Sequence, residues 1–169
     1  MKIRYATLAD AKRIAEINTE GWQTAYRGII PDEILDAMDV QSRIEAIRSS
    51  LIQAPNQDLV CEDESQRILG FVSFGKMRWE QFCEQCDCEL YAIYVESNAR
   101  GKGVGKALFQ ATLAEFKSQG KRSMLVNVLE GNASSVKFYQ HLGGQVIGNK
   151  DFTLQGINYP QLTFAFGTQ

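Results

Sequence analysis

Three glycines stand at alternate positions in the segment NARGKGVGKALF, residues 98–109. A run of β-forming residues, LYAIYV, precedes the segment, and an apolar pattern with helical spacing follows it. Glycines let a backbone approach a ligand without obstruction by Cβ, and the first amides of a helix lack intrahelical acceptors. This junction therefore predicts an α/β fold in which a strand, a tight turn and a helix N-terminus form an anion site.

Two common nucleotide cradles do not fit the segment. A Walker A loop would need a glycine in place of Arg100 and a hydroxyl in place of Ala107. The dinucleotide pattern GxGxxG lacks its third glycine whether it begins at Gly101 or at Gly103. The spacing instead predicts a pyrophosphate site that needs no metal, although the glycines alone are also compatible with a simple strand-to-helix turn.

Hydrophobic periodicity predicts a mixed α/β architecture around one central sheet. Thr7 and Asp10 resemble a helix start signal, and Gly120 is placed as a helix stop. The expected elements, in order, are a strand in KIRYAT, a helix over 8–26, a short helix over 31–38, a third element over 44–51, a hairpin from DLVCEDE and RILGFVSFGKM, a strand in CELYAIYVE, a helix to about residue 119, a strand in RSMLVNVL, a short helix in NASSVKFYQHLGG and a final strand in NYPQLTFAF.

Composition narrows the class of protein. The chain has 169 residues, of which 44% are hydrophobic and 22% charged, and its net charge is −2. We expect a single domain over residues 1–169, because that length suffices for one core. Scattered basic residues predict no nucleic-acid partner, and the absence of a long apolar run predicts a cytoplasmic protein with no membrane partner.

Three cysteines lie close together at Cys83, Cys86 and Cys88. Their CxxCxC spacing could begin a zinc site, but Cys61 and the one histidine, His141, are distant in sequence. We expect no metal and reduced loop thiols.

The glycine segment resembles the signature [RQ]xxGxG of the GCN5-related N-acetyltransferase (GNAT) family, with Arg100, Gly103 and Gly105 in the matching positions. A second stretch, VNVLEGNASSVKFYQHLGG, is similar to the second half of the domain in that family. The matching residues there are Asn132, Phe138, Tyr139, Leu142 and Gly143.

The resemblance implies the GNAT fold, in which a mixed central sheet flanked by helices splays open at the acyl-CoA site. It implies acetyl-CoA as the acyl donor, with the pantetheine arm against the backbone of Ile93, Tyr94 and Val95. Asn132 would contact the arm, or would serve only as a helix N-cap. The pyrophosphate would be held by Arg100, Gly101, Lys102, Gly103, Val104, Gly105 and Lys106.

The resemblance also implies direct transfer of the acetyl group to a primary amine of a small molecule or a peptide or protein. Tyr139 matches the residue that protonates the departing sulfur, and a free phenol, with a pKa of about 10, is a proton donor at neutral pH. Tyr139 could instead be a packed aromatic. Glu89 matches a position used for the general base, or is a solvated carboxylate at a strand end; Asn127 stands where other members carry a glutamate. None of the cysteines lies in either signature, so no acyl-enzyme is expected.

The acceptor site is predicted in the front half of the chain. Trp22 and Tyr26 lie four residues apart, and Trp79 stands near the end of the hairpin, so an aromatic mouth is one interpretation and a core stripe the other. Two other functions remain open, a non-catalytic acyl-CoA-binding or regulatory module and a zinc-stabilised interaction module. A homodimer also remains open, and Gly144 departs from the aromatic residue that relatives usually carry there.

Overall fold

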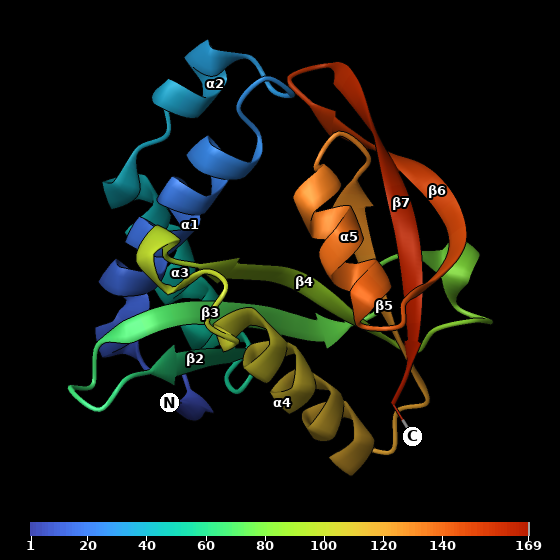
Figure 1. Ribbon diagram of the computed structural model, residues 1–169, viewed down its shortest axis with the longest axis horizontal. Helices are drawn as coiled ribbons and strands as arrows, with labels where there is room; N and C mark the ends of the chain where they lie inside the picture. The colour runs from blue at the N-terminus through green and yellow to red at the C-terminus, as the bar shows by residue number, and fades with distance from the viewer. Residues whose placement is uncertain (169) are drawn as a thin grey trace. The chain divides into compact units, whose positions relative to one another are not determined.

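The computed structural model describes residues 1–168 (Figure 1). Helices and strands are mixed along the chain, as the periodicity predicts. In chain order they are β1 (Lys2–Tyr5), η1 (Leu8–Asp10), α1 (Ala11–Ala25), α2 (Asp32–Asp36), α3 (Val40–Gln53), β2 (Asp58–Glu62), β3 (Ile68–Lys76), η2 (Glu80–Phe82), β4 (Cys88–Val95), η3 (Ser97–Ala99), α4 (Val104–Ser118), β5 (Ser123–Leu129), α5 (Ala133–His141), β6 (Gln145–Leu154) and β7 (Ile157–Gly167).

The strands form a seven-stranded mixed sheet in the order β1-β2-β3-β4-β5-β7-β6. The pairs β1–β2, β2–β3, β5–β7 and β6–β7 are antiparallel, whereas β4 and β5 are parallel. The parallel pairing joins Cys88–Leu90 to Met124–Val126, near the start of both strands. The predicted fold class, an open mixed sheet flanked by helices, is confirmed.

Contacts divide the chain into two compact units. The first consists of Met1–Phe74 with Ala92–Thr112, and the second of Gly75–Tyr91 with the chain from Leu113 onward. The boundaries cut β3, β4 and α4, so these three elements belong to both units. The single domain expected from the sequence remains a prediction.

In the first unit, helices α1 and α3 lie side by side (Figure 1). Ile14 and Ile17 of α1 share a core cluster with Val60, Ile68 and Phe71 of the strands. The predicted helix over 8–26 is largely confirmed, because a 3₁₀ turn runs directly into α1. Its start signal is real, since the carboxylate of Asp10 accepts the N–H of Thr7 at 2.7 Å.

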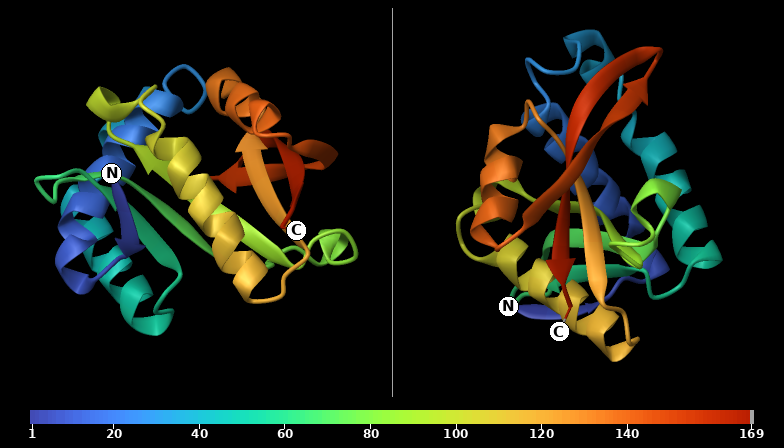
Figure 2. Two further views of the ribbon diagram at one scale, coloured as in Figure 1. Left: turned by 60° about the horizontal axis from the view of Figure 1, so that its bottom comes forward. Right: turned by 90° about the vertical axis from the view of Figure 1, so that its right-hand side faces the viewer.

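In the second unit, β6 and β7 form a long hairpin, visible at one end of the sheet in Figure 2. Strand β6, QVIGNKDFTL, was not predicted from the sequence, because the stretch GNKD at 148–151 interrupts its β-forming residues. The missed signal is the two-residue turn at Gln155 and Gly156, whose φ angles of 50° and 79° suit a tight hairpin. Residues along β6 alternate between half-buried and exposed from Gly148 onward, as expected for a strand with one covered face.

Candidate functional site

The glycine segment forms a tight turn between β4 and α4. Gly101 and Gly103 have φ angles of 74° and 85°, in the left-handed region that favours glycine. The N–H of Ala107 donates to the carbonyl of Gly103 at 2.9 Å, so the amides of Val104, Gly105 and Lys106 precede the first helical bond. These amides, with the positive end of the helix dipole, suit a pyrophosphate group.

Two details of this turn differ from the expectation. Gly105 lies inside α4, so the turn depends on the left-handed Gly101 and Gly103 and not on Gly103 and Gly105. The Nε of Arg100 donates to the carbonyl of Val95 at 3.2 Å, which brings that side chain back onto the end of β4. Lys102 and Lys106 are exposed beside the turn, where they could pair with phosphate charge.

The end of β4 packs into the first unit through Tyr94. Its ring lies so close to Gly21 of α1 that a Cβ there would overlap it, and its centroid is 5.9 Å from that of Phe71. Ile93 and Val95 are half-buried. The carbonyl of Val95 thus already accepts a hydrogen bond from Arg100. Val95 is one of the three residues whose backbone is predicted to bind pantetheine.

Trp22 and Tyr26 come together in the first unit, as their spacing predicts. Their ring centroids are 4.9 Å apart in an edge-to-face arrangement. The hydroxyls of Tyr26 and Tyr94 lie 3.2 Å apart, and burial raises the pKa of Tyr26 although the bond with Tyr94 lowers it. This group joins two predicted acceptor residues to a predicted cofactor residue.

Asn132 and Tyr139 lie in the second unit, at the start of α5 and within it. The Oδ1 of Asn132 accepts the N–H of Ser135 at 3.1 Å, so the N-cap interpretation is confirmed. The two N–H groups of the Asn132 amide are not used by this cap and could donate to a ligand. Tyr139 is buried, with its ring centroid 6.1 Å from those of both Phe164 and Phe166 of β7.

Gly144 stands where relatives usually carry an aromatic residue, and two aromatic rings of β7 pack beside it. A Cβ at Gly144 would lie 2.6 Å from Phe166 and 2.9 Å from Phe164. These two rings fill the space beside Gly144 and also support Tyr139. The packing behind Tyr139 is thus provided by β7.

Glu89 is not the solvated carboxylate that one interpretation expected, because only 1% of it is exposed. Arg78 donates to it through Nε at 3.1 Å, through a second guanidinium nitrogen at 2.7 Å and through its backbone N–H at 3.2 Å. The indole N–H of Trp79 donates at 3.0 Å to Oε1, which also accepts the 2.7 Å bond from Arg78. The donors from Arg78 and Trp79 explain how this carboxylate can be buried, and its role as a general base stays a prediction.

Arg78 and Lys150 are residues that the sequence analysis missed. The Arg78 guanidinium lies 4.0 Å from the ring centroid of Tyr91, and Lys150 Nζ lies 3.1 Å from that of Trp79. Burial lowers the pKa of Lys150, and the nearby Arg78 lowers it further while Glu89 raises it. A signal for Arg78 was the glutamate at position 89 inside an otherwise apolar strand, which requires a cation nearby.

The cysteines show little sign of metal chemistry. Cys86 and Cys88 are buried against Ser123, whereas Cys83 is exposed. Burial raises the pKa of Cys88 to about 12, which disfavours the thiolate that a metal binds. Among residues 1–168, no group of three or more histidine, cysteine, aspartate or glutamate side chains has the arrangement of a metal site.

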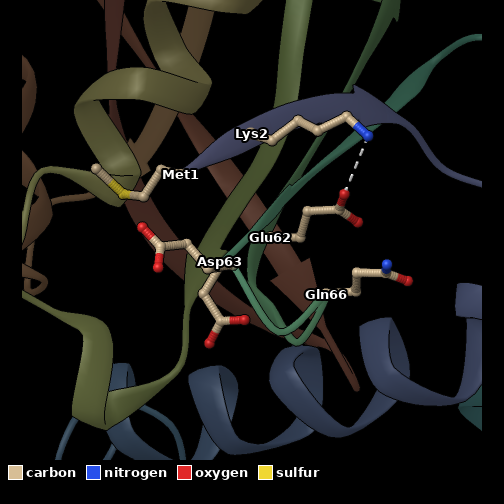
Figure 3. A pocket seen from close by; sticks show the side chains of 6 residues that line it. Met1, Lys2, Glu62, Asp63 and Gln66 are labelled. Atoms are coloured by element: carbon tan, nitrogen blue, oxygen red, sulfur yellow. Dashed lines mark ion pairs between the residues drawn. The ribbon is translucent and has the colours of Figure 1, made fainter.

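A separate hollow of about 290 Å³ lies in the first unit, at the edge formed by β1 and the β2–β3 turn (Figure 3). The ammonium of Lys2 pairs with Glu62 there at 3.4 Å. None of the predicted site residues lines it; the lining residues are Met1, Lys2, Glu62, Asp63, Glu64 and Gln66. No helix within residues 1–168 is both long enough and apolar enough to cross a membrane.

The sequence and the fold were compared with those of known proteins, and the matches indicate one family. The model of the acetyltransferase (GNAT) family matches residues 14–144, which include both sequence signatures. The uncharacterized N-acetyltransferase YuaI from Bacillus subtilis is 35% identical over 161 residues, covering 95% of this chain and 89% of YuaI.

Solved structures agree with this assignment. The ribosomal-protein-alanine N-acetyltransferase from Brucella melitensis superimposes with a TM-score of 0.72 at 26% identity, over 99% of each chain. The protein yncA from Salmonella typhimurium, solved with its cofactor acetyl-CoA, superimposes with a TM-score of 0.70 at 23% identity, over 100% of this chain and 94% of yncA. The second likeness shows a shared fold.

Proposed function

Since this chain belongs to the acetyltransferase (GNAT) family and its named relatives are acyltransferase enzymes, we propose that it transfers acetyl from acetyl-CoA directly to a primary amine. The acceptor is a small molecule or a peptide or protein amine. The observation that supports the proposal is the turn at Gly101 and Gly103, after which the amides of Val104, Gly105 and Lys106 precede the first helical bond of α4 and could bind a pyrophosphate.

Acetyl-CoA would supply an acetyl group activated as a thioester. The chain would bind it through the turn of residues 100–106 and through the backbone of Ile93–Val95, with the Asn132 amide as a further donor. Fixing a flexible donor at several points before reaction reduces the entropic part of the barrier. No metal enters this scheme.

Tyr139 would donate a proton to the sulfur that leaves. A general acid of this kind contributes about 10²–10⁴-fold to a rate. Phe164 and Phe166 support its ring, so the side chain has little freedom to turn away.

The amine must be neutral when it attacks, so its proton must reach a base or water. Glu89 is the base that the family resemblance implies. Both of its oxygens already accept from Arg78 or Trp79, so accepting a further proton would displace one of these donors. We therefore expect Glu89 to hold Arg78 and Trp79 in place and the proton to leave through water.

The aromatic residues proposed for the acceptor are Trp22 and Tyr26 of the first unit and, by itself in the second unit, Trp79. The indole N–H of Trp79 donates to Glu89, and the ammonium of Lys150 lies over the face of its ring. These rings offer apolar surface and cation-binding faces to an amine. The single domain over 1–169, the cytoplasmic location and the lack of a nucleic-acid or membrane partner are part of the same proposal.

The test is release of free thiol from acetyl-CoA with a panel of amines, combined with calorimetric binding of CoA. We expect Tyr139→Phe to lower kcat about 100-fold, the loss of a general acid, while the Kd for CoA stays within about threefold. Tyr159→Phe is the matched control: it is another buried tyrosine of the second unit, and its hydroxyl has no partner among residues 1–168. It should retain wild-type kcat.

Two results would contradict the proposal. Wild-type protein that fails to bind CoA would exclude an acyl-CoA enzyme. Wild-type protein that binds CoA but releases no thiol above background with any amine would favour the regulatory module instead.

A further inference from the structure

A buried carboxylate, Glu96, directly follows β4 at the entrance to the glycine turn. It is 6% exposed, and its Oε2 accepts from the guanidinium groups of both Arg13 and Arg67, the latter at 2.7 Å. Arg13 belongs to α1, and Arg67 to the turn between β2 and β3. One carboxylate oxygen thus joins three segments of the first unit.

Neighbouring bonds hold the same point of the chain. The N–H of Glu96 donates to the carbonyl of Leu69 at 2.9 Å. The N–H of Ser97 donates to Glu20 of α1 at 3.2 Å, and the Ser97 hydroxyl donates to the same oxygen. The backbone that enters the turn is therefore fixed to α1 and β3.

The far side of the turn also rests on β3. A Cβ at Gly70 would lie 2.8 Å from the carbonyl oxygen of Tyr94 and 3.1 Å from Val104, the first residue of α4. Gly70 therefore permits close approach of both the strand end and the helix start. Between them, Gly101, Lys102 and Gly103 are exposed. The positions of the phosphate-facing amides thus depend on anchors outside the turn.

We propose that Glu96 is a positioning residue for the pyrophosphate turn: by pairing with Arg13 and Arg67 it fixes the turn's entrance so that the amides of α4 converge on one anion. This inference rests on the proposed function, because it assumes that the turn binds CoA. Part of the affinity for the CoA pyrophosphate would then depend on the ion pairs of Glu96, which do not contact the ligand.

Glu96→Gln provides a change of charge at nearly constant size. Arg13 would keep its bonds to Glu16 at 3.2 Å and to the carbonyl of Ile68 at 3.3 Å, and Arg67, whose side chain is 55% exposed, would turn to water. The entrance would then have more freedom, and the amides would lose part of their alignment. A misplacement of about 1 Å can cost on the order of 100-fold where geometry is critical, and we expect about tenfold here.

The experiment compares calorimetric Kd values for CoA and for pantetheine, which lacks the pyrophosphate and the nucleoside. Glu96→Gln should raise the Kd for CoA about tenfold and that for pantetheine less than twofold, by the same alignment argument. A general loss of structure would weaken both ligands alike, so the ratio separates positioning from folding.

Glu62→Gln is the matched control. Glu62 is 4% exposed in the same unit and also pairs with two cations, Arg4 at 2.8 Å and Lys2 at 3.4 Å, but it lies on β2. It should leave the ratio of the two Kd values unchanged. If Glu96→Gln fails to fold, the half-exposed Arg67→Gln tests the same ion pair, with a smaller shift in the same direction.

An unchanged ratio in a folded Glu96 or Arg67 variant would overturn the inference, as would an equal shift in Glu62→Gln. Failure of the proposed function looks different, because the wild-type protein itself would then bind neither CoA nor pantetheine.

Discussion

Strand β4 is bounded by two buried carboxylates, Glu89 within its start and Glu96 just beyond its end. Both accept from arginine, but the donors of Glu89 come from two adjacent residues, Arg78 and Trp79, and include a backbone N–H and an indole N–H. The donors of Glu96 come from Arg13 and Arg67, which lie in different segments.

The two ends of β4 are therefore stabilised in different ways. Glu89 closes a local loop, whereas Glu96 fastens the pyrophosphate turn to distant parts of its unit. The Arg13 and Arg67 side chains, 29% and 55% exposed, can turn to water if Glu96 is lost. The Arg78 side chain, 53% exposed, has the same freedom, but the backbone N–H of Arg78 and the indole N–H of Trp79 make part-buried bonds to Glu89 and are less free to rotate toward water. The two carboxylates should therefore contribute differently to stability and to binding.

The largest expected effect is on folding. Glu89→Ala should lower the free energy of unfolding by about 3 kcal/mol, since it leaves part-buried donors without acceptors and opens a void. Glu96→Ala should lower it by about 1.5 kcal/mol, because its guanidinium partners can rehydrate. Urea unfolding at neutral pH measures both.

The double variant Glu89→Ala/Arg78→Ala sharpens this comparison. It should be less destabilised than the sum of the single variants, because each single variant already removes the bonds that join the two side chains. Equal losses for Glu89→Ala and Glu96→Ala would show that the number and kind of donors do not matter here.

Sequence could predict the tight turn between β4 and α4 because its geometry is local. Left-handed glycines, the start of α4 and the cap at Asn132 each depend on a few consecutive residues. The hairpin of β2 and β3 was predictable for the same reason, from two apolar runs and a polar turn.

The ion pairs could not be predicted in this way. Glu96 and Arg13 are 83 positions apart, and no periodicity links them. Glu89 and Arg78 are only 11 apart, but an irregular loop separates them, so the family position of Glu89 suggested a base while its partners remained unseen. Strand β6 was missed because its pairing with β7, and not its own composition, makes it a strand.

A smaller change at Glu89 distinguishes two roles for this residue: an anchor that holds Arg78 and Trp79 in place, and a general base that accepts the proton of the amine. Glu89→Gln keeps the size and one acceptor but removes the charge, so it should lower the free energy of unfolding by about 1–2 kcal/mol, the difference between a charged and a neutral hydrogen bond. If Glu89 is an anchor, kcat falls less than about tenfold and the pH–rate profile keeps its acid limb. Exposed Glu80→Gln, in the same unit, is the control and should change neither quantity.

A base would behave otherwise. Loss of at least about 100-fold in kcat, with disappearance of the acid limb and unchanged stability, would assign the proton transfer to Glu89 after all.

The smallest expected effect concerns a buried carboxylate without a cation. Asp58 of β2 is 8% exposed, and burial raises its pKa although the hydroxyl of Ser73 donates to it and lowers it. Since the pKa of the folded state lies above that of the unfolded chain, the stability contributed by protonated Asp58 is complete below the unfolded value, about 3.9, and is lost as pH rises through the folded value. Asp58→Asn should thus raise Tm at pH 7 by roughly 2–4 °C, and the gain should vanish near pH 3.

Asp63→Asn supplies a control of opposite sign. The Ser65 hydroxyl and the N–H of Arg67 lower the pKa of Asp63, so its ionised form stabilises the folded chain above the unfolded pKa and that contribution is lost as pH falls. Asp63→Asn should therefore lower Tm at pH 7 and converge with the wild type in acid. Thermal unfolding followed by circular dichroism between pH 3 and pH 7, at roughly one-unit steps across this titration range, measures both variants. A destabilised Asp58→Asn at pH 7 would mean that its Ser73 bond needs the charge, and that a buried carboxylate in this chain can be stable without the arginines that Glu89 and Glu96 require.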